Sequence, residues 1–172
     1  DKVQEGELIF EDKKVDVSDL MFSMKRKVLT GVSYNRAKRK RVFFDDWRGN
    51  IQIKLEAQLP DYEIGITSFS KDETKAIVVA YSDKSRGEYY FYDTETNKLT
   101  SLGKISPWLN EDHMAEMVPI AYTSRDGLTI NGYLTIPKGS DGKNLPIVVN
   151  PHGGPWARDS WGYNPEIQFL AN

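Results

Sequence analysis

A short run near the carboxyl end of the chain combines residue types that serve acyl-transfer chemistry. It reads Asn150-Pro151-His152-Gly153-Gly154-Pro155-Trp156-Ala157-Arg158-Asp159. A tetrahedral intermediate develops negative charge on oxygen, and rigid backbone N–H groups aimed at that oxygen stabilise it without reorganisation. Glycine suits this task because, without a Cβ, its backbone can approach a substrate and adopt turns that other residues avoid. The run therefore predicts one side of an oxyanion hole at Gly153 and Gly154.

The elements expected around this run bear on a second interpretation, because Gly-Gly and Gly-Pro are also common in ordinary turns. Residues 145–149 are continuously apolar, which is typical of a parallel strand buried on both faces. Further on, Asn164-Pro165-Glu166 combines an N-cap, a proline at the first helical position and an acid in the first turn. A buried strand, a glycine loop and a helix start in this order favour the oxyanion loop of an α/β-hydrolase over a plain turn.

The chain before this region is rich in β-type runs separated by polar turns, and we find no long helical period up to about residue 110. Asp126-Gly127 predicts a tight hairpin, because this pair tolerates the positive φ of such a turn. The expected strands are residues 7–10, 27–34, 41–45, 51–58, 63–69, 76–81, 88–92, 98–102, 118–123 and 128–137.

Two of these strand pairs are similar enough to indicate a repeat. Val42-Phe43-Phe44-Asp45 matches Tyr90-Phe91-Tyr92-Asp93 at an offset of 48 residues (93 minus 45), and Val32 and Tyr34 match Val79 and Tyr81 at an offset of 47 (79 minus 32). We attribute the difference of one residue to hairpin loops of unequal length. Four-stranded units recurring at about 40 to 50 residues are typical of β-propeller blades. The alternative is an unrelated meander whose aromatic residues coincide by chance.

The composition is that of an ordinary globular protein: 172 residues, 39% hydrophobic, 28% charged, and a net charge of -2. No apolar run approaches the roughly 18 residues of a membrane-spanning helix, so we expect a soluble protein with no membrane association. The sequence leaves the compartment open between cytoplasm and periplasm. The chain has no cysteine, which excludes a thiol nucleophile and cysteine-based metal sites. It has two histidines, and we predict neither a metal nor a cofactor.

Two charged clusters have plain explanations. A basic cluster falls in an expected hairpin, where solvated charge is normal, so we predict no nucleic-acid partner; it comprises Arg36, Lys38, Arg39, Lys40 and Arg41. A second cluster offers oxygen and nitrogen ligands but no second nearby histidine, so we interpret it as a polar linker between domains; it comprises Glu111, Asp112, His113 and Glu116.

Four segments together resemble the entry into the catalytic domain of prolyl oligopeptidase-family serine peptidases, especially the acylaminoacyl-peptidase and dipeptidyl-aminopeptidase-like branch. They are residues 119–127, 130–137, 145–149 and 152–159. The resemblance implies a β-propeller before an α/β-hydrolase domain and capping its active site. We therefore expect a mainly β chain: about two C-terminal propeller blades over residues 1–113, then the first strands and first helix start of a hydrolase domain over residues 114–172.

Positions carried over from this family give each residue of the loop an expected role. Gly154, with Gly153 beside it, would supply an oxyanion-hole N–H. His152 would be a structural residue of the loop, because the base of these enzymes lies near the end of the catalytic domain. The other structural residues of the loop would be Pro155, Trp156, Arg158 and Asp159.

No serine of the chain lies in a Gly-x-Ser-x-Gly nucleophile elbow. Since the triad order in α/β-hydrolases is Ser, Asp or Glu, and then His, all after the oxyanion strand, we expect the triad beyond residue 172. The expectation is thus a fragment of a peptidase acting on short peptides by Ser-His-Asp acyl transfer. This chain would supply only the oxyanion side, would be inactive alone and would tend to self-associate. The alternative is a non-catalytic propeller that serves as a binding or interaction module.

Overall fold

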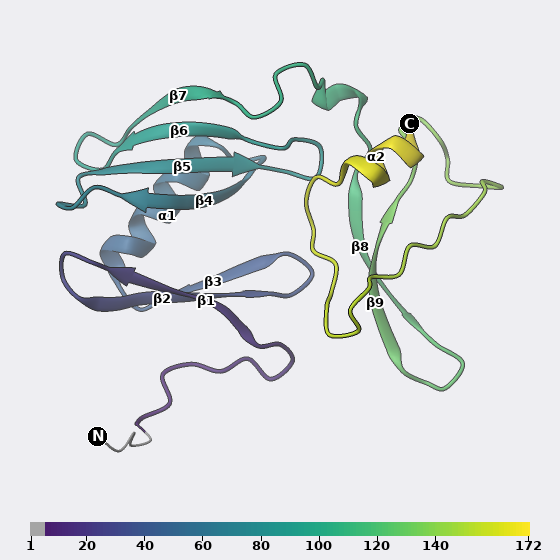
Figure 1. The fold of residues 1–172 in the computed structure, drawn as a ribbon, viewed down its shortest axis with the longest axis horizontal. Helices are drawn as coiled ribbons and strands as arrows, with labels where there is room; N and C mark the ends of the chain where they lie inside the picture. The colour runs from purple at the N-terminus through teal and green to yellow at the C-terminus, as the bar shows by residue number, and fades with distance from the viewer. Residues whose placement is uncertain (1–5) are drawn as a thin grey trace.

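The computed structural model describes residues 6–172, and it is mainly β, with three antiparallel sheets in chain order (Figure 1). The first sheet contains β1 (Val17–Ser23), β2 (Val28–Asn35) and β3 (Arg39–Phe43). The second contains β4 (Glu63–Phe69), β5 (Lys75–Tyr81), β6 (Glu88–Asp93) and β7 (Lys98–Lys104). The third contains β8 (Met117–Thr123) and β9 (Thr129–Thr135). In each sheet, every strand pairs with its neighbours along the chain.

One helix forms an apolar core with the second sheet. Helix α1 (Asp46–Gln58) lies behind the four-stranded sheet in Figure 1. Its buried Leu55 and Ile51 pack against the sheet in one apolar cluster with Ile64, Val78 and Tyr92. Burying such side chains removes apolar surface from water at roughly 25 cal/mol per Å², so this cluster is the main stabilising contact between the helix and the sheet.

The helix corrects the expectation of a strand over residues 51–58. Apolar residues at Ile51, Ile53 and Leu55 alternate as in a strand, but only Ile51 and Leu55 are buried, while Ile53 is 64% exposed. Ile51 and Leu55 are four residues apart, the spacing of one helix face. Asp45 is the N-cap of the helix, and its side chain accepts a hydrogen bond from the Arg48 backbone N–H at 2.9 Å.

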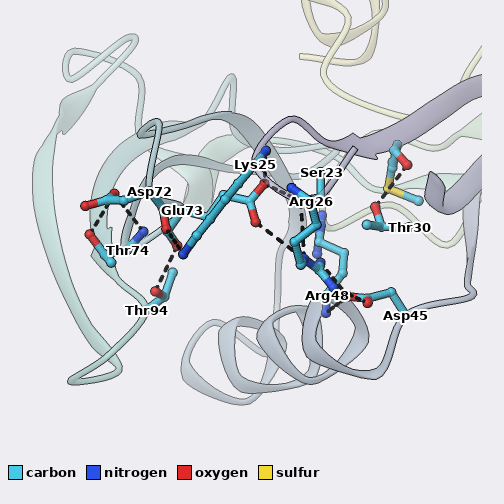
Figure 2. A network of polar contacts seen from close by, with 11 residues as sticks. Ser23, Lys25, Arg26, Thr30, Asp45, Arg48, Asp72, Glu73, Thr74 and Thr94 are labelled. Atoms are coloured by element: carbon cyan, nitrogen blue, oxygen red, sulfur yellow. Dashed lines mark hydrogen bonds and ion pairs between the residues drawn. The ribbon is translucent and has the colours of Figure 1, made fainter. Parts of the chain in front are cut away.

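A polar network joins the first two sheets and the start of α1 (Figure 2). Glu73, in the β4–β5 turn, is buried, and its carboxylate accepts a hydrogen bond of 2.6 Å from the Ser23 hydroxyl at the end of β1. Arg26, in the β1–β2 turn, lies 3.8 Å from that carboxylate and forms a 2.5 Å ion pair with Asp45. The Lys25 ammonium donates to the Asp72 carbonyl oxygen at 3.1 Å. The network therefore fixes the β1–β2 turn against both the second sheet and the helix.

The mainly β fold is confirmed, and its two first sheets are compatible with parts of propeller blades. Both hairpins of the predicted repeat form, as β2–β3 and β5–β6. Their registers differ from the sequence match, however, because Val32 pairs with Val42 whereas Val79 pairs with Tyr89, not Tyr90. If Val32 and Val79 are equivalent positions, the strand pairing makes Tyr89 the equivalent of Val42. The sequence match at an offset of 48 chose Tyr90, one residue further along.

The hydrolase-like end agrees with the expectations in two of its elements. The β8–β9 hairpin turns at Gly127, which has a φ of +85° and donates its N–H to the Ser124 carbonyl at 3.0 Å. Helix α2 (Pro165–Ala171) begins as expected, with the Asn164 side chain accepting from the N–H groups of Glu166 and Ile167.

Besides residues 51–58, two further expected strands are wrong, and one observed strand, β1, was not expected. Residues 145–149 are irregular, with Ile147 86% and Val149 81% exposed, because no other strand among the described residues pairs with them. Residues 7–10 are likewise irregular, and β1 lies further along the chain. Its sequence is half polar and its burial follows no simple alternation, so its pairing with β2 is what makes it a strand.

Within residues 6–172, no helix has the length and apolar character needed to cross a membrane.

Candidate functional site

The glycine loop, by which we mean residues 152–159, is an exposed segment whose backbone conformation requires glycine at one position. Gly154 has a φ of +137°, and a Cβ built there would lie 2.8 Å from the Trp156 backbone nitrogen. Both the backbone conformation and the close approach exclude a side chain. Gly153 has an ordinary φ, and a Cβ there would meet nothing within 4 Å. The structure therefore distinguishes the two glycines, which the sequence alone does not.

The backbone N–H groups of Gly153 and Gly154 have no acceptor within residues 6–172. The nearest internal hydrogen bond of the loop runs from the Ala157 N–H to the Pro155 carbonyl at 2.9 Å. Both glycines are exposed and neither N–H group is used within the described residues, so both can bind an anionic oxygen that reaches the loop. The arrangement can thus stabilise negative charge, which is the chemistry expected of the loop.

The remaining residues of the loop differ in how they are held. His152 is exposed, and its Nδ1 lies 3.0 Å from the Gly153 carbonyl oxygen, which only accepts, so the proton is assigned to Nδ1. Trp156 is 98% exposed, and Asp159 forms no ion pair with a described residue. No serine hydroxyl within residues 6–172 hydrogen-bonds to His113 or His152, the two histidines of the chain.

Arg158 connects this loop to the first sheet. Its Nη1 donates to the Asn35 carbonyl and its Nη2 to the Arg36 carbonyl, both at 2.7 Å. Its Nε donates to the Asp159 carbonyl at 3.2 Å. Arg158 is thus rich in hydrogen bonds, and all three of them go to backbone carbonyls.

A buried cluster holds helix α2 against the segment that precedes β8. Gln168 is 6% exposed, and its amide accepts from the Ala115 N–H and donates to the carbonyls of Ala115 and Asp83, at 2.8 to 3.0 Å. The Asp83 carboxylate accepts from the Met117 N–H at 2.7 Å, and the Trp161 indole donates to the Met117 carbonyl at 2.8 Å. The sequence did not predict this cluster. The one signal for it was Gln168, a polar residue among the apolar residues of a short helix.

The charged clusters have structural partners inside the chain. In the basic hairpin, Arg36 pairs with Asp12 at 2.8 Å, Arg39 with Asp19, and Arg41 with Glu63 at 3.6 Å. In the predicted linker, Asn110 caps a 3-10 turn over Glu111–His113.

Glu111 in that turn accepts a hydrogen bond of 2.9 Å from the Tyr62 hydroxyl. Burial and this carboxylate together raise the pKa of Tyr62 to about 12, so its hydroxyl remains a donor at neutral pH. The contact ties the linker to the second sheet.

The order of elements agrees with the one that the resemblance to prolyl oligopeptidase-family peptidases implies: antiparallel sheets come first, and a further hairpin, the His-Gly-Gly-Pro loop and a capped helix follow. No family model matches the chain. Curated relatives nevertheless confirm the resemblance, and the chain is related to peptidases of this family.

Two relatives match nearly the whole chain. It is 32% identical over 180 residues to dipeptidyl aminopeptidase BIII of Pseudoxanthomonas mexicana, covering 96% of this chain and 25% of that protein. It is 23% identical over 195 residues to dipeptidyl peptidase family member 6 of Caenorhabditis elegans, covering 98% of this chain and 26% of that protein. An uncharacterized peptidase of Bacillus subtilis, YuxL, is 28% identical over 120 residues, 69% of this chain and 18% of that protein. The chain thus spans about a quarter of the length of the first two relatives.

Proposed function

We propose that this chain is part of a serine peptidase that cleaves short peptides and releases an N-terminal dipeptide or acylated amino acid. Residues 1–113, of which the first five lie outside the described residues, would be the last blades of a β-propeller. Residues 114–172 would begin the hydrolase domain, the boundary falling just after the 3-10 turn. The names of the first two relatives support dipeptide release, and the propeller would restrict substrates by size.

The observation that carries the proposal is the pair of unbonded N–H groups in the Gly153-Gly154 loop. In the proposed reaction, a serine attacks the scissile carbonyl, and the carbonyl oxygen becomes an oxyanion. A loop N–H then donates a hydrogen bond to that oxygen and lowers the energy of the tetrahedral intermediate. Serine, aspartate and histidine of the triad would lie outside these 172 residues, since the chain has no nucleophile elbow.

A comparison of two preparations tests this proposal. The 172-residue chain and the whole protein that contains it are incubated with dipeptidyl and acylaminoacyl anilides, with and without a serine-directed fluorophosphonate. We expect hydrolysis by the whole protein, abolished by the fluorophosphonate, and none by the chain alone. Serine-dependent turnover by the chain would contradict the assignment of the triad. An inactive whole protein that does not react with the fluorophosphonate would instead support the alternative, a non-catalytic binding module.

The same preparation of the chain addresses self-association, which is part of the proposal. Large apolar side chains lie exposed in its last part, among them Ile147, Val149 and Phe169, each more than 80% exposed. Exposed apolar surface of this kind favours association. Light scattering should show oligomers, and a monomer at all concentrations would contradict this.

A further inference from the structure

Every residue of the β2–β3 turn, positions 35–38, is contacted by the hydrolase-like part of the chain, which follows it by 96 to 123 residues. Arg158 binds the carbonyls of Asn35 and Arg36. The Tyr133 hydroxyl in β9 donates to the Ala37 carbonyl at 2.8 Å. The Lys38 ammonium lies 3.7 Å from the centroid of the Trp161 ring. We call this set of contacts, between residues 35–38 and Tyr133, Arg158 and Trp161, the hairpin latch.

Arg158 is the anchor of the glycine loop. Going back along the chain, the previous side chain that bonds to another element is Lys138, which donates to the Asp112 carbonyl. Between these two residues, every hydrogen bond of the described structure is local. Only three residues separate Gly154 from Arg158. The position of the loop therefore depends on Arg158 more than on any other contact in the described residues.

The chemistry of the latch makes it directional but moderate in strength. A guanidinium presents its donors in a rigid planar fork, so two carbonyls bound by Nη1 and Nη2 fix its orientation as well as its distance. The bonds are exposed, so water competes with them, and the latch can yield when the turn moves. Oxyanion donors, in contrast, must stay within a fraction of an ångström of their working position, since a displacement of 1 Å costs roughly 100-fold in rate.

We propose that the β2–β3 hairpin positions the oxyanion loop through Arg158. The placement of the Gly153 and Gly154 donors then depends on the contact between the first sheet and the hydrolase-like part. Arg158 is a positioning residue, which acts through the loop backbone and touches no substrate. Because it binds backbone carbonyls, the side chains at positions 35–37 are not part of the device. This inference rests on the proposed function.

The first test measures steady-state kinetics of the whole peptidase. In Arg158→Ala we expect kcat to fall roughly 10- to 100-fold with KM changed less than about threefold, because the donors act on the transition state. Arg158→Lys keeps the charge and an ammonium donor, so its kcat should lie between those of the wild-type enzyme and Arg158→Ala. Arg125→Ala is the matched control, since Arg125 is exposed in the β8–β9 turn and forms no ion pair with a described residue. Equal kinetics for the two alanine variants, or a change in KM alone, would overturn the proposal.

The second test does not depend on activity. The chain lacks cysteine, so spin labels can be placed cleanly at Lys40→Cys in β3 and at Trp156→Cys, whose side chain is 98% exposed. The distance distribution between the labels is measured in the whole peptidase, in which any cysteine outside this chain is replaced by serine. It should be narrow in the otherwise unaltered protein, at least twofold broader with Arg158→Ala, and unaltered with Arg125→Ala. An unchanged width with Arg158→Ala overturns the latch whatever the activity shows. If Arg158→Ala broadens the distribution in an active peptidase but does not lower kcat, the latch has no role in catalysis. An inactive wild-type peptidase refutes only the proposed function.

Discussion

Replacing Gly154 with alanine should lower kcat of the whole peptidase by roughly 100- to 1000-fold, the loss associated with one oxyanion-hole donor. The added Cβ would lie 2.8 Å from the Trp156 nitrogen, and a φ of +137° is unfavourable for any residue with a Cβ. The backbone must therefore rotate, and the Gly154 N–H turns away from the substrate oxygen. KM should change little, because the lost interaction forms in the transition state.

Gly153→Ala is the matched comparison for this experiment. Its Cβ would meet no atom within 4 Å, its φ is ordinary, and alanine keeps the N–H group. The expected loss of kcat is therefore several-fold at most. Similar losses at the two positions, with both variants folded by circular dichroism, would show that the conformation of Gly154 is not what the reaction requires.

Replacing Leu55 with alanine should reduce the free energy of unfolding by about 3 kcal/mol, within the range of 2–5 kcal/mol typical of buried leucines. Leu55 is fully buried, and it packs in the cluster that joins α1 to the second sheet. Truncation removes its apolar contacts and leaves a cavity between helix and sheet. Urea unfolding followed by tryptophan fluorescence measures the change.

Ile53→Ala in the same helix serves as the control, because Ile53 is 64% exposed. The two substitutions remove similar volumes, so burial is the main difference between them. We expect a change of about 0.5 kcal/mol or less for Ile53→Ala. Equal losses for both variants would mean that α1 does not present the Ile51 and Leu55 face to the sheet.

The local signals in the sequence predicted the fold where a few adjacent residues decide the structure. Asn164 and Pro165 predicted the start of α2, and Asp126-Gly127 predicted the β8–β9 hairpin. Residues 51–58 gave the wrong result because Ile51, Ile53 and Leu55 fit a strand and a helix equally well over so short a window. Burial against Ile64 and Val78 resolves the ambiguity, and that contact lies outside the window.

The site was predictable only in part for the same physical reason. The two glycines indicated the loop in the sequence, because a positive φ such as that of Gly154 is a backbone conformation that glycine adopts far more readily than other residues. The partners of Arg158 are backbone carbonyls 122 and 123 residues away, and a carbonyl carries no mark in the sequence. Residues 145–149 were expected as a buried strand from their apolar character, but a strand also needs a neighbour to pair with, and the described residues offer none.

The pairing of each strand with its chain neighbours has a consequence for the order of folding. Strands joined by short turns close small loops, which costs little chain entropy, so such sheets form early and quickly. The Arg158 and Gln168 contacts reach 123 and 85 residues back, and they close large loops. During synthesis from the amino terminus, the first two sheets are therefore complete before the residues of the glycine loop exist. The hairpin at residues 35–38 is then already formed when the glycine loop is made, and the loop can dock onto it.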